Sequence, residues 1–436
     1  MKIQIPDSGG KVNGLIITDL FPPDPGGRSE KMYRHIKYFN RQGINVDVLC
    51  PSTTIASASY PIEGFKSTCH RVRPFWAEHL ASLKWQENFM AQSVLGTLWL
   101  KLKLPSGYIR WILPAYIKAC SLIRRNAITF IVGVSNPIAT QLICILLKMS
   151  FRKICYVAEL RDPVTGYYRS RHSNFVNKII ESCIVRMADC IVEWKDFTQF
   201  PVCRKYPFVT SSSIFIDNVG YDPDDYRKFQ SIISYNKSLN IIYTGGYYGE
   251  KDLWEILFIA IKKLIEKGLK IKIHYYGDWD KVQDALYKEI NKNGSRWLKV
   301  YGRVPKNHCI TACMKANATL YILDNNNENM KRISSKIYDY FACKRPILAI
   351  VPEDSLVETK IKSYDDRFIL TIPVGIPINK KTSVIKLMDI LENLYETFLE
   401  KKLADGICYD ESLYSCLEGE NIFVKTIINH VTRQTK

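Results

Sequence analysis

The sequence predicts an α/β protein of two successive parallel-sheet domains that face each other across a cleft. The chain has 436 residues, which is too long for one compact hydrophobic core. Short apolar runs that suit buried parallel strands alternate with segments of helical spacing. This alternation begins near Leu15 and begins again at Leu239. Glycines follow strand ends in both halves, and open α/β sheets bind ligands at those ends, so we expect a ligand between the domains.

The composition is that of a basic globular protein from a reducing compartment. Apolar residues make up 47% of the chain, charged residues make up 24%, and the net charge of +18 favours polyanionic partners. The 13 cysteines are odd in number and scattered, which argues against a disulfide framework. The segment MKIQIPDSGG lacks the apolar core of a signal peptide, and no run of 18 uncharged apolar residues exists. We therefore expect a cytoplasmic protein without a spanning helix.

Two short motifs look like metal sites, but neither is predicted to be one. Cys309 and Cys313 are spaced CxxxC beside His308, with no second pair to complete four zinc ligands. The DWD sequence at 278–280 is similar to the DxD of some sugar transferases, but acidic residues there also favour a helix N-terminus. We predict no metal site and no cofactor.

The first domain opens with a strand, a loop rich in proline and glycine, and a helix. Leu15–Asp19 is a short apolar run, and FPPDPGGRSE follows it. Gly26 and Gly27 let the backbone approach a ligand closely, and Ser29 begins a helix that runs to about Arg41. The segment lacks the G-x-G-x-x-G and GxxxxGKS/T fingerprints, so it supports neither NAD nor ATP binding of those kinds.

A long basic segment follows. No Asp or Glu occurs between Asn88 and Ala158, whereas nine Lys or Arg do, together with Trp99 and Trp111. Basic residues mixed with tryptophan and leucine suit the surface of an anionic membrane. An ordinary solvated basic helix face is an equal alternative. No nucleic-acid module accompanies the charge, so we expect no nucleic-acid partner.

Polar residues also follow the strands predicted at 128–134 and 154–158. The second strand continues into ELRDP, where Glu159, Arg161 and Asp162 crowd a strand end. These charges form either a polar functional site or a salt-bridged strand end.

The second domain repeats the alternation of strands and helices. FIDNVGYDPDDY, at 215–226, is rich in turn formers and predicts the junction before it. LNIIYTGGYYG is a strand followed by a glycine loop that contains Gly246, and a later strand ends at Gly302 and Arg303. The expected divisions are a first domain, a second domain and a C-terminal helical extension that packs back on the first, at residues 1–230, 231–403 and 404–436.

The stretch Ile333–Val351 predicts a loop, a helix and a buried strand. Ser334 and Ser335 suit the helix start, because serine oxygens accept hydrogen bonds from first-turn amides. Lys336 lies in that first turn, where a cation opposes the helix dipole unless an anion lies in front of it. Asp339 shares the same helix face. A lysine at a helix N-terminus predicts a phosphate site.

The order of these motifs resembles that of the GT-B glycosyltransferases, in particular the family-four retaining group. FPPDPGG resembles the glycine-rich loop after strand one, and ELRDP resembles the segment D-x-R-D-P-W of bacterial polysaccharide members. FIDNVGYDP resembles the junction I-x-N-G-x-D-x-x-x-F with an extra Val219. YTGGYYG is similar to Y-x-G-x-x-x-G, and KIYDYFACKRPILAI to K-x-x-E-Y-x-A-x-G-K-P-V-L. The resemblance implies two Rossmann-like domains and covers most of the chain, less so residues 52–126.

The resemblance also implies roles for individual residues. The family commonly uses two glutamates, and the second, which accepts hydrogen bonds from the donor ribose, falls at Asp339. The first, which contacts the donor sugar, falls at Lys331, with Glu328 as a substitute in the preceding loop. Lys251 and Lys336 take the place of the usual Arg–Lys pair for the diphosphate.

Both domains contribute the remaining predicted site residues. Gly26 and Gly27 line the donor diphosphate, while Arg161 and Asp162 contact the acceptor or the donor. The second domain adds four donor-binding residues: Gly246, Arg303, Ser334 and Ser335.

The function implied is transfer of a sugar from a nucleotide diphosphate to a glycan or lipid-linked acceptor, with retention of configuration. The enzyme would be cytoplasmic and peripheral on a membrane. Two alternatives stay open. Lys331 motivates a non-catalytic relative that binds nucleotide as a partner subunit. A nucleotide-sugar epimerase would need neither an acceptor nor a membrane.

Overall fold

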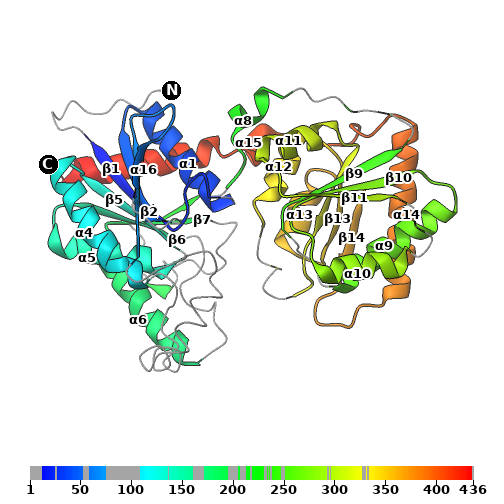
Figure 1. Cartoon of the computed structure of the whole chain (residues 1–436), viewed down its shortest axis with the longest axis horizontal. Coiled ribbons are helices and arrows are strands. Elements are labelled where there is room, and N and C mark those ends of the chain that lie inside the picture. Colours follow the sequence, from blue (N-terminus) through cyan, green and yellow to red (C-terminus); the bar gives the residue numbers. More distant parts are fainter. Residues whose placement is uncertain are drawn as a thin grey trace. The chain divides into compact units, whose positions relative to one another are not determined.

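The computed structural model divides into two α/β units, each built on its own sheet (Figure 1). The first unit comprises Met1–Asp217 and Glu418–Lys436, and the second comprises Asn218–Leu417. The predicted class, α/β with two Rossmann-like domains, is confirmed. The structure describes residues 12–24, 27–52, 58–74, 109–135, 137–160, 171–194, 205–206, 213–216, 219–229, 233, 235, 238–246, 251–291, 294, 296–326, 330 and 333–434.

The boundaries lie at 217/218 and 417/418, compared with 230/231 and 403/404 from the sequence. Backbone pairing between the two connecting segments accounts for this position. Tyr221 forms a bridge with Ser415, its amide donates to Tyr414 O over 3.0 Å, and its carbonyl accepts from Cys416 N over 2.8 Å. These bonds join the two segments to each other within the second unit.

The sheet of the first unit has eight strands in the order β3-β4-β2-β1-β5-β6-β7-β8. β3 and β4 pair antiparallel, and the other neighbours pair parallel. The strands are β1 (Asn13–Ile17), β2 (Asn45–Pro51), β3 (Ala58–Pro61), β4 (Thr68–Val72), β5 (Phe130–Ser135), β6 (Cys155–Leu160), β7 (Cys190–Trp194) and β8 (Ser213–Ile216). All residues of β5, β6 and β7 are buried, which explains why most of them are apolar.

Helices flank this sheet (Figure 1). They are α1 (Gly27–Arg41), α4 (Ile109–Arg125), α5 (Ile138–Ser150), α6 (Arg171–Met187) and α16 (Leu417–Gln434). α4 buries Trp111, Ala115 and Ala119, which recur every four residues and form one helix face. α16 comes from the end of the chain, yet Phe423 and Ile427 are fully buried in the first unit.

The sheet of the second unit has six strands in the order β11-β10-β9-β12-β13-β14, and all neighbours are parallel. The strands are β9 (Leu239–Thr244), β10 (Ile271–Tyr276), β11 (Leu298–Gly302), β12 (Ala318–Ile322), β13 (Ile347–Pro352) and β14 (Ile369–Ile372). The helices are α8 (Pro223–Arg227), α9 (Lys251–Glu266), α10 (Lys281–Ile290), α11 (Lys306–Lys315), α12 (Lys336–Cys343), α13 (Leu356–Lys362), α14 (Lys380–Leu399) and α15 (Glu411–Tyr414).

Aromatic side chains fill the core beneath one end of this second sheet. The ring of Tyr243 stacks on Tyr275 at 4.9 Å and meets Trp254 edge-on at 5.3 Å, and all three side chains are fully buried. This packing fixes Tyr243 at the end of β9. Within the described part of the chain, no helix combines the length and apolar character needed to cross a bilayer.

Candidate functional site

The carboxyl edge of the second sheet carries the candidate site. Strand order reverses between β9 and β12, and such a switch point opens a crevice outside the strand ends. β9 ends at Thr244 and leads into Gly245 and Gly246, while β12 leads into Leu323 and Asp324. The predicted donor-binding loop therefore lies where this topology binds ligands.

The backbones of Gly245 and Gly277 cross closely, so Gly277 leaves no room for a side chain, while Gly245 has a φ angle that favours glycine. A Cβ atom added to Gly277 would lie 1.8 Å from the carbonyl oxygen of Gly245. The φ angles are positive, +101° at Gly245 and +153° at Gly277. The amide of Gly245 donates to the carbonyl of Tyr276 over 2.8 Å. The crossing fixes the loop and keeps its backbone bare for a ligand.

Lys336, the first residue of α12, lies against this loop. A Cβ atom on Gly245 would be 3.9 Å from its Cδ. Its Nζ donates to the Tyr243 hydroxyl over 2.9 Å and lies 4.1 Å from the Tyr243 ring centroid and 5.1 Å from that of Tyr321. The Tyr243 hydroxyl in turn donates to Gly246 O over 2.8 Å. Two aromatic rings thus hold a cation beside the strand ends.

The surroundings of Lys336 shift its proton affinity. Burial lowers the pKa of Lys336 to about 7, and the nearby carboxylate of Asp324 opposes the shift. The ammonium group is therefore only partly charged near neutral pH. An anion bound beside it would stabilise the charged form, as expected of a phosphate-binding lysine.

The predicted serine cap of α12 is wrong. Ser335 makes no capping hydrogen bond from its side chain, because its backbone is already helical at φ −58° and ψ −25°. Instead, the amides of Ile337 and Tyr338 donate to the carbonyls of Ser334 and Ser335, each over 3.2 Å. Ser334 Oγ accepts from Tyr321 OH over 3.2 Å. Ser334 is therefore joined to the aromatic pair around Lys336, while Ser335 is exposed.

Asp339 lies one turn after Lys336 and is held by two other elements. Its Oδ1 accepts a hydrogen bond from the hydroxyl of Tyr226 on α8. The ammonium group of Lys306, on α11, lies 3.9 Å from the same oxygen. The Asp339 side chain remains 35% exposed, so the carboxylate is accessible at the surface of the second unit.

Arg303 and Lys251, the other predicted donor-binding residues of the second unit, have different surroundings. Arg303 forms a bidentate ion pair with Asp278, with both N–O distances 2.6 Å. The Arg303 guanidinium lowers the pKa of Asp278. Lys251 is the exposed first residue of α9. The structure thus joins Gly246, Ser334 and Lys336 through shared tyrosines. Within the described ranges, it joins neither Arg303 nor Lys251 to them. 

Several predicted residues lie outside the described residues: Gly26, Arg161, Asp162, Glu328 and Lys331. Gly27 is described, and it is the exposed first residue of α1.

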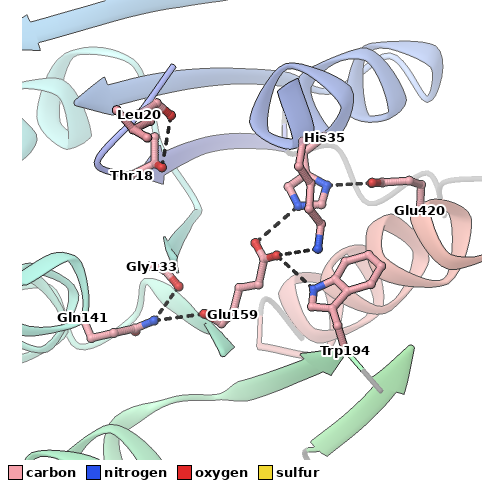
Figure 2. A network of polar contacts seen from close by, with 9 residues as sticks. Thr18, Leu20, His35, Gly133, Gln141, Glu159, Trp194 and Glu420 are labelled. Carbon is pink, nitrogen blue, oxygen red and sulfur yellow. Dashed lines mark hydrogen bonds and ion pairs between the residues drawn. The ribbon is translucent and has the colours of Figure 1, made fainter. Parts of the chain in front are cut away.

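The first unit contains a buried ionic network that sequence reasoning missed (Figure 2). Glu159, at the end of β6, accepts from Trp194 Nε1 over 2.9 Å and lies 3.1 Å from Lys31 Nζ and 3.3 Å from His35 Nε2. His35 Nδ1 lies 2.6 Å from Glu420 Oε2 on α16. The Lys31 ammonium is 3.0 Å from the Trp194 ring centroid. For Glu159, the salt-bridged strand end was therefore the better of the two sequence interpretations.

The network favours the protonated form of its histidine. Burial lowers the pKa of His35, but Glu420 and Glu159 raise it by more, so the net shift is upward. Phe423 stacks on the imidazole at 4.4 Å. The four-residue spacing of Lys31 and His35 on α1 was the available sequence signal. Glu420 lies 385 residues from His35, so no local pattern connects them.

Among the residues that the structure describes, no group of three or more His, Cys, Asp or Glu side chains is arranged to hold a metal ion. The candidate site therefore rests on Lys336, Asp339 and the glycine loop.

Comparisons with known proteins address the fold. Neither a protein-family model nor a curated protein sequence matches the chain. Sucrose-phosphate synthase from Thermosynechococcus elongatus is 12% identical, with a TM-score of 0.59 over 97% of this chain and 99% of its own. The catalytic domain of starch synthase IV from Arabidopsis thaliana, bound to ADP and acarbose, is 10% identical, with a TM-score of 0.58 over 97% and 100%.

A Listeria monocytogenes protein provisionally assigned as a UDP-N-acetylglucosamine 2-epimerase is 11% identical, with a TM-score of 0.56 over 97% of this chain and 98% of its own. At such identities the likeness establishes the fold alone. The chain has the fold of the GT-B class, built from two Rossmann-like domains.

Proposed function

We propose that the protein transfers a sugar from a nucleotide diphosphate to a glycan or lipid-linked acceptor, with retention of configuration. The observation that carries the proposal is Lys336, held between Tyr243 and Tyr321 beside the bare backbone of Gly245. A cation on a glycine loop at a sheet switch point suits a diphosphate. The ADP in the starch synthase structure is consistent with a nucleotide ligand on this fold.

The catalytic contribution of Lys336 would be electrostatic. As the sugar leaves, negative charge develops on the diphosphate, and a positioned ammonium group stabilises that charge. Asp339 would accept a hydrogen bond from the ribose, as the family resemblance implies. Glu328 would contact the sugar, and Gly26 and Gly27 would line the diphosphate. Arg161 and Asp162 would contact the acceptor or the donor. Leaving-group phosphate oxygen would act as the base, so no protein nucleophile is required.

Calorimetry with UDP, ADP and GDP tests the donor site. Lys336→Met should weaken binding of the preferred nucleotide by about 10- to 100-fold, the range expected for a hydrogen bond to a charged group. Lys315→Met is the matched control, because Lys315 is exposed at the far end of α11. Equal affinities for the wild type and Lys336→Met would contradict the proposed role.

Turnover tests separate the alternatives. Radiolabelled UDP-, ADP- and GDP-linked sugars are incubated with the protein and a membrane lipid extract. Label in a glycan or lipid product supports transfer, and its anomeric configuration tests retention. An isomerised sugar without acceptor would favour an epimerase. Nucleotide binding without any turnover would favour a non-catalytic partner subunit, the reading that Lys331 motivates.

A membrane-facing surface on α4 and α5 would bring the enzyme to the membrane that contains the lipid-linked acceptor. Four apolar side chains on these helices are exposed: Leu113, Ile117, Leu146 and Met149. Tyr116 OH lies 2.6 Å from Ser150 Oγ, so the two helices adjoin. Exposed basic residues lie in the last turn of α4 and just after α5: Arg124, Arg125, Arg152 and Lys153. With no acidic residue between 88 and 158, this surface suits anionic lipid at the cytoplasmic face.

Sedimentation with vesicles tests this surface. The wild type should bind vesicles of mixed phosphatidylcholine and phosphatidylglycerol more strongly than vesicles of phosphatidylcholine alone, and salt should weaken the binding. Ile117→Asp should also weaken vesicle binding, because burial of apolar side chains in the membrane surface contributes to the affinity as well as charge. Ile385→Asp is the control, since Ile385 is equally exposed on α14 of the other unit. Vesicle binding that depends neither on lipid charge nor on Ile117→Asp would contradict the proposed membrane surface.

A further inference from the structure

Two residues at which the chain departs from the family patterns contact each other. In the junction pattern D-x-x-x-F, counted from Asp222, the last position is Tyr226 rather than phenylalanine. In the helix pattern K-x-x-E-Y, counted from Lys336, the glutamate position is Asp339. One residue gains a hydroxyl group and the other loses a methylene group. The Tyr226 hydroxyl donates a hydrogen bond to Asp339 Oδ1, although the residues are 113 positions apart.

The tyrosine is held firmly enough to orient the carboxylate. Tyr226 is only 5% exposed, and its ring packs edge-on against Tyr221 at 5.1 Å. Asp222 caps the short helix α8 by accepting from the amide of Asp224. Tyr221 is pinned to residues 414 and 416 by backbone hydrogen bonds of 3.0 Å and 2.8 Å. The phenol therefore has a fixed position in the second unit.

The two oxygens of Asp339 have different surroundings. Oδ1 accepts from Tyr226 and lies 3.9 Å from Lys306 Nζ. Among the residues that the structure describes, Oδ2 has no hydrogen-bond partner. Since the side chain is 35% exposed, Oδ2 can accept a hydrogen bond from a hydroxyl group of a ligand.

We propose that Tyr226 is a positioning residue for ribose recognition by Asp339. This inference rests on the proposed function, because it concerns the nucleotide-diphosphate site. Aspartate reaches less far than glutamate, so its carboxylate must be fixed in one orientation to meet a ribose hydroxyl. Tyr226 fixes Oδ1, which leaves Oδ2 as the acceptor. The hydroxyl group of Tyr226 thus compensates for the shorter side chain of Asp339 by fixing the orientation of its carboxylate.

Ribose discrimination provides a readout that mere stabilisation of the fold would not change. Calorimetry compares UDP, ADP and GDP with their 2′-deoxy and 3′-deoxy analogues. For the nucleotide that binds best, the wild type should prefer the ribose form over at least one deoxy form by about 10-fold. Tyr226→Phe and Asp339→Ala should each reduce this preference toward unity while leaving deoxynucleotide affinity nearly unchanged.

A reciprocal exchange tests compensation directly. Asp339→Glu alone should weaken ribonucleotide binding, because the longer side chain crowds the phenol. Combining it with Tyr226→Phe should restore affinity to within about 3-fold of the wild type, a coupling typical of residues in contact. Tyr235→Phe is the control, since it removes a 3.0 Å hydrogen bond to Lys401 O elsewhere in the same unit. Circular dichroism confirms that each variant is folded.

The outcomes separate the inference from the function beneath it. An unchanged ribose preference in Tyr226→Phe, or a double variant no better than Asp339→Glu, would overturn the positioning role even if the wild type binds nucleotide. A wild type that binds none of the nucleotide diphosphates would overturn the proposed function, and this inference with it.

Discussion

The ammonium group of Lys336 lies 2.9 Å from the hydroxyl of Tyr243 and 4.1 Å from the centre of the same ring. A single tyrosine therefore provides both a hydrogen-bond acceptor and a π face for one cation. This arrangement explains how a lysine is accommodated in a surrounding that lowers its pKa to about 7.

Affinity for a nucleotide diphosphate should fall as pH rises above about 7. Bound phosphate favours charged Lys336, whereas the free lysine loses its proton near that pH. Below about pH 7 the free lysine is already protonated, so the contribution of Lys336 to the affinity no longer changes with pH. Calorimetry from about pH 7 to about pH 9, in buffers of different ionisation enthalpy, measures the slope and the proton uptake. Lys336→Arg stays charged and should bind without uptake. A pH-independent wild type would contradict this prediction.

His35 should stabilise the first unit most at low pH. Its folded pKa is raised above the unfolded value of 6.5, so the stabilisation is complete below 6.5 and is lost as pH rises through the folded pKa. The difference in Tm between the wild type and His35→Gln should therefore shrink with rising pH. His430→Gln is the control, because His430 contacts Thr426 O of its own helix at 3.0 Å. A pH-independent difference for His35→Gln would refute the assignment.

Glu159→Gln should destabilise the protein by about 3–5 kcal/mol, because it leaves two buried cationic groups with one carboxylate partner fewer. Urea unfolding measures the change in free energy. Glu63→Gln alters an exposed glutamate of the same unit and should change it by less than about 0.5 kcal/mol. Similar values for both variants would show that the network contributes little.

Gly277→Ala should destabilise the second unit far more than Gly268→Ala. Both positions have positive φ, which costs about 1–2 kcal/mol for alanine. Only Gly277 also faces backbone, at 1.8 Å, whereas a Cβ on Gly268 meets nothing within 4 Å. Denaturant unfolding should therefore show a clearly larger loss for Gly277→Ala, together with loss of nucleotide binding. Equal losses would mean that the backbone crossing can relax.

Local patterns in the sequence predicted the elements that depend on local physics. The apolar run after Pro346 became β13, and the helix before it became α12, because periodicity and chain punctuation determine both. The sequence predicts Lys336 in the first turn of that helix, and the structure has it as the first residue of α12, beside Gly245. β3 and β4 were missed, since short strands with little periodicity resemble loops.

Contacts between distant elements could not be predicted in the same way. The pairing of Tyr226 with Asp339 depends on how α8 packs on α12, which no spacing encodes. The serine cap failed because Ser335 already has helical backbone angles, a feature that side-chain preference alone does not determine. Sequence patterns thus suggest candidate site residues, whereas packing decides which of their side chains meet.

The division of the chain also bears on how the protein is made. The first unit is completed by residues 418–436, which follow the second unit in the sequence and are synthesised after it. On the ribosome, the second unit can fold while His35 still lacks Glu420 and Phe423. Until α16 has emerged, the first unit would expose the apolar surface that this helix covers. Emergence of α16, rather than of the N-terminal half, would therefore start the final folding step of the first unit.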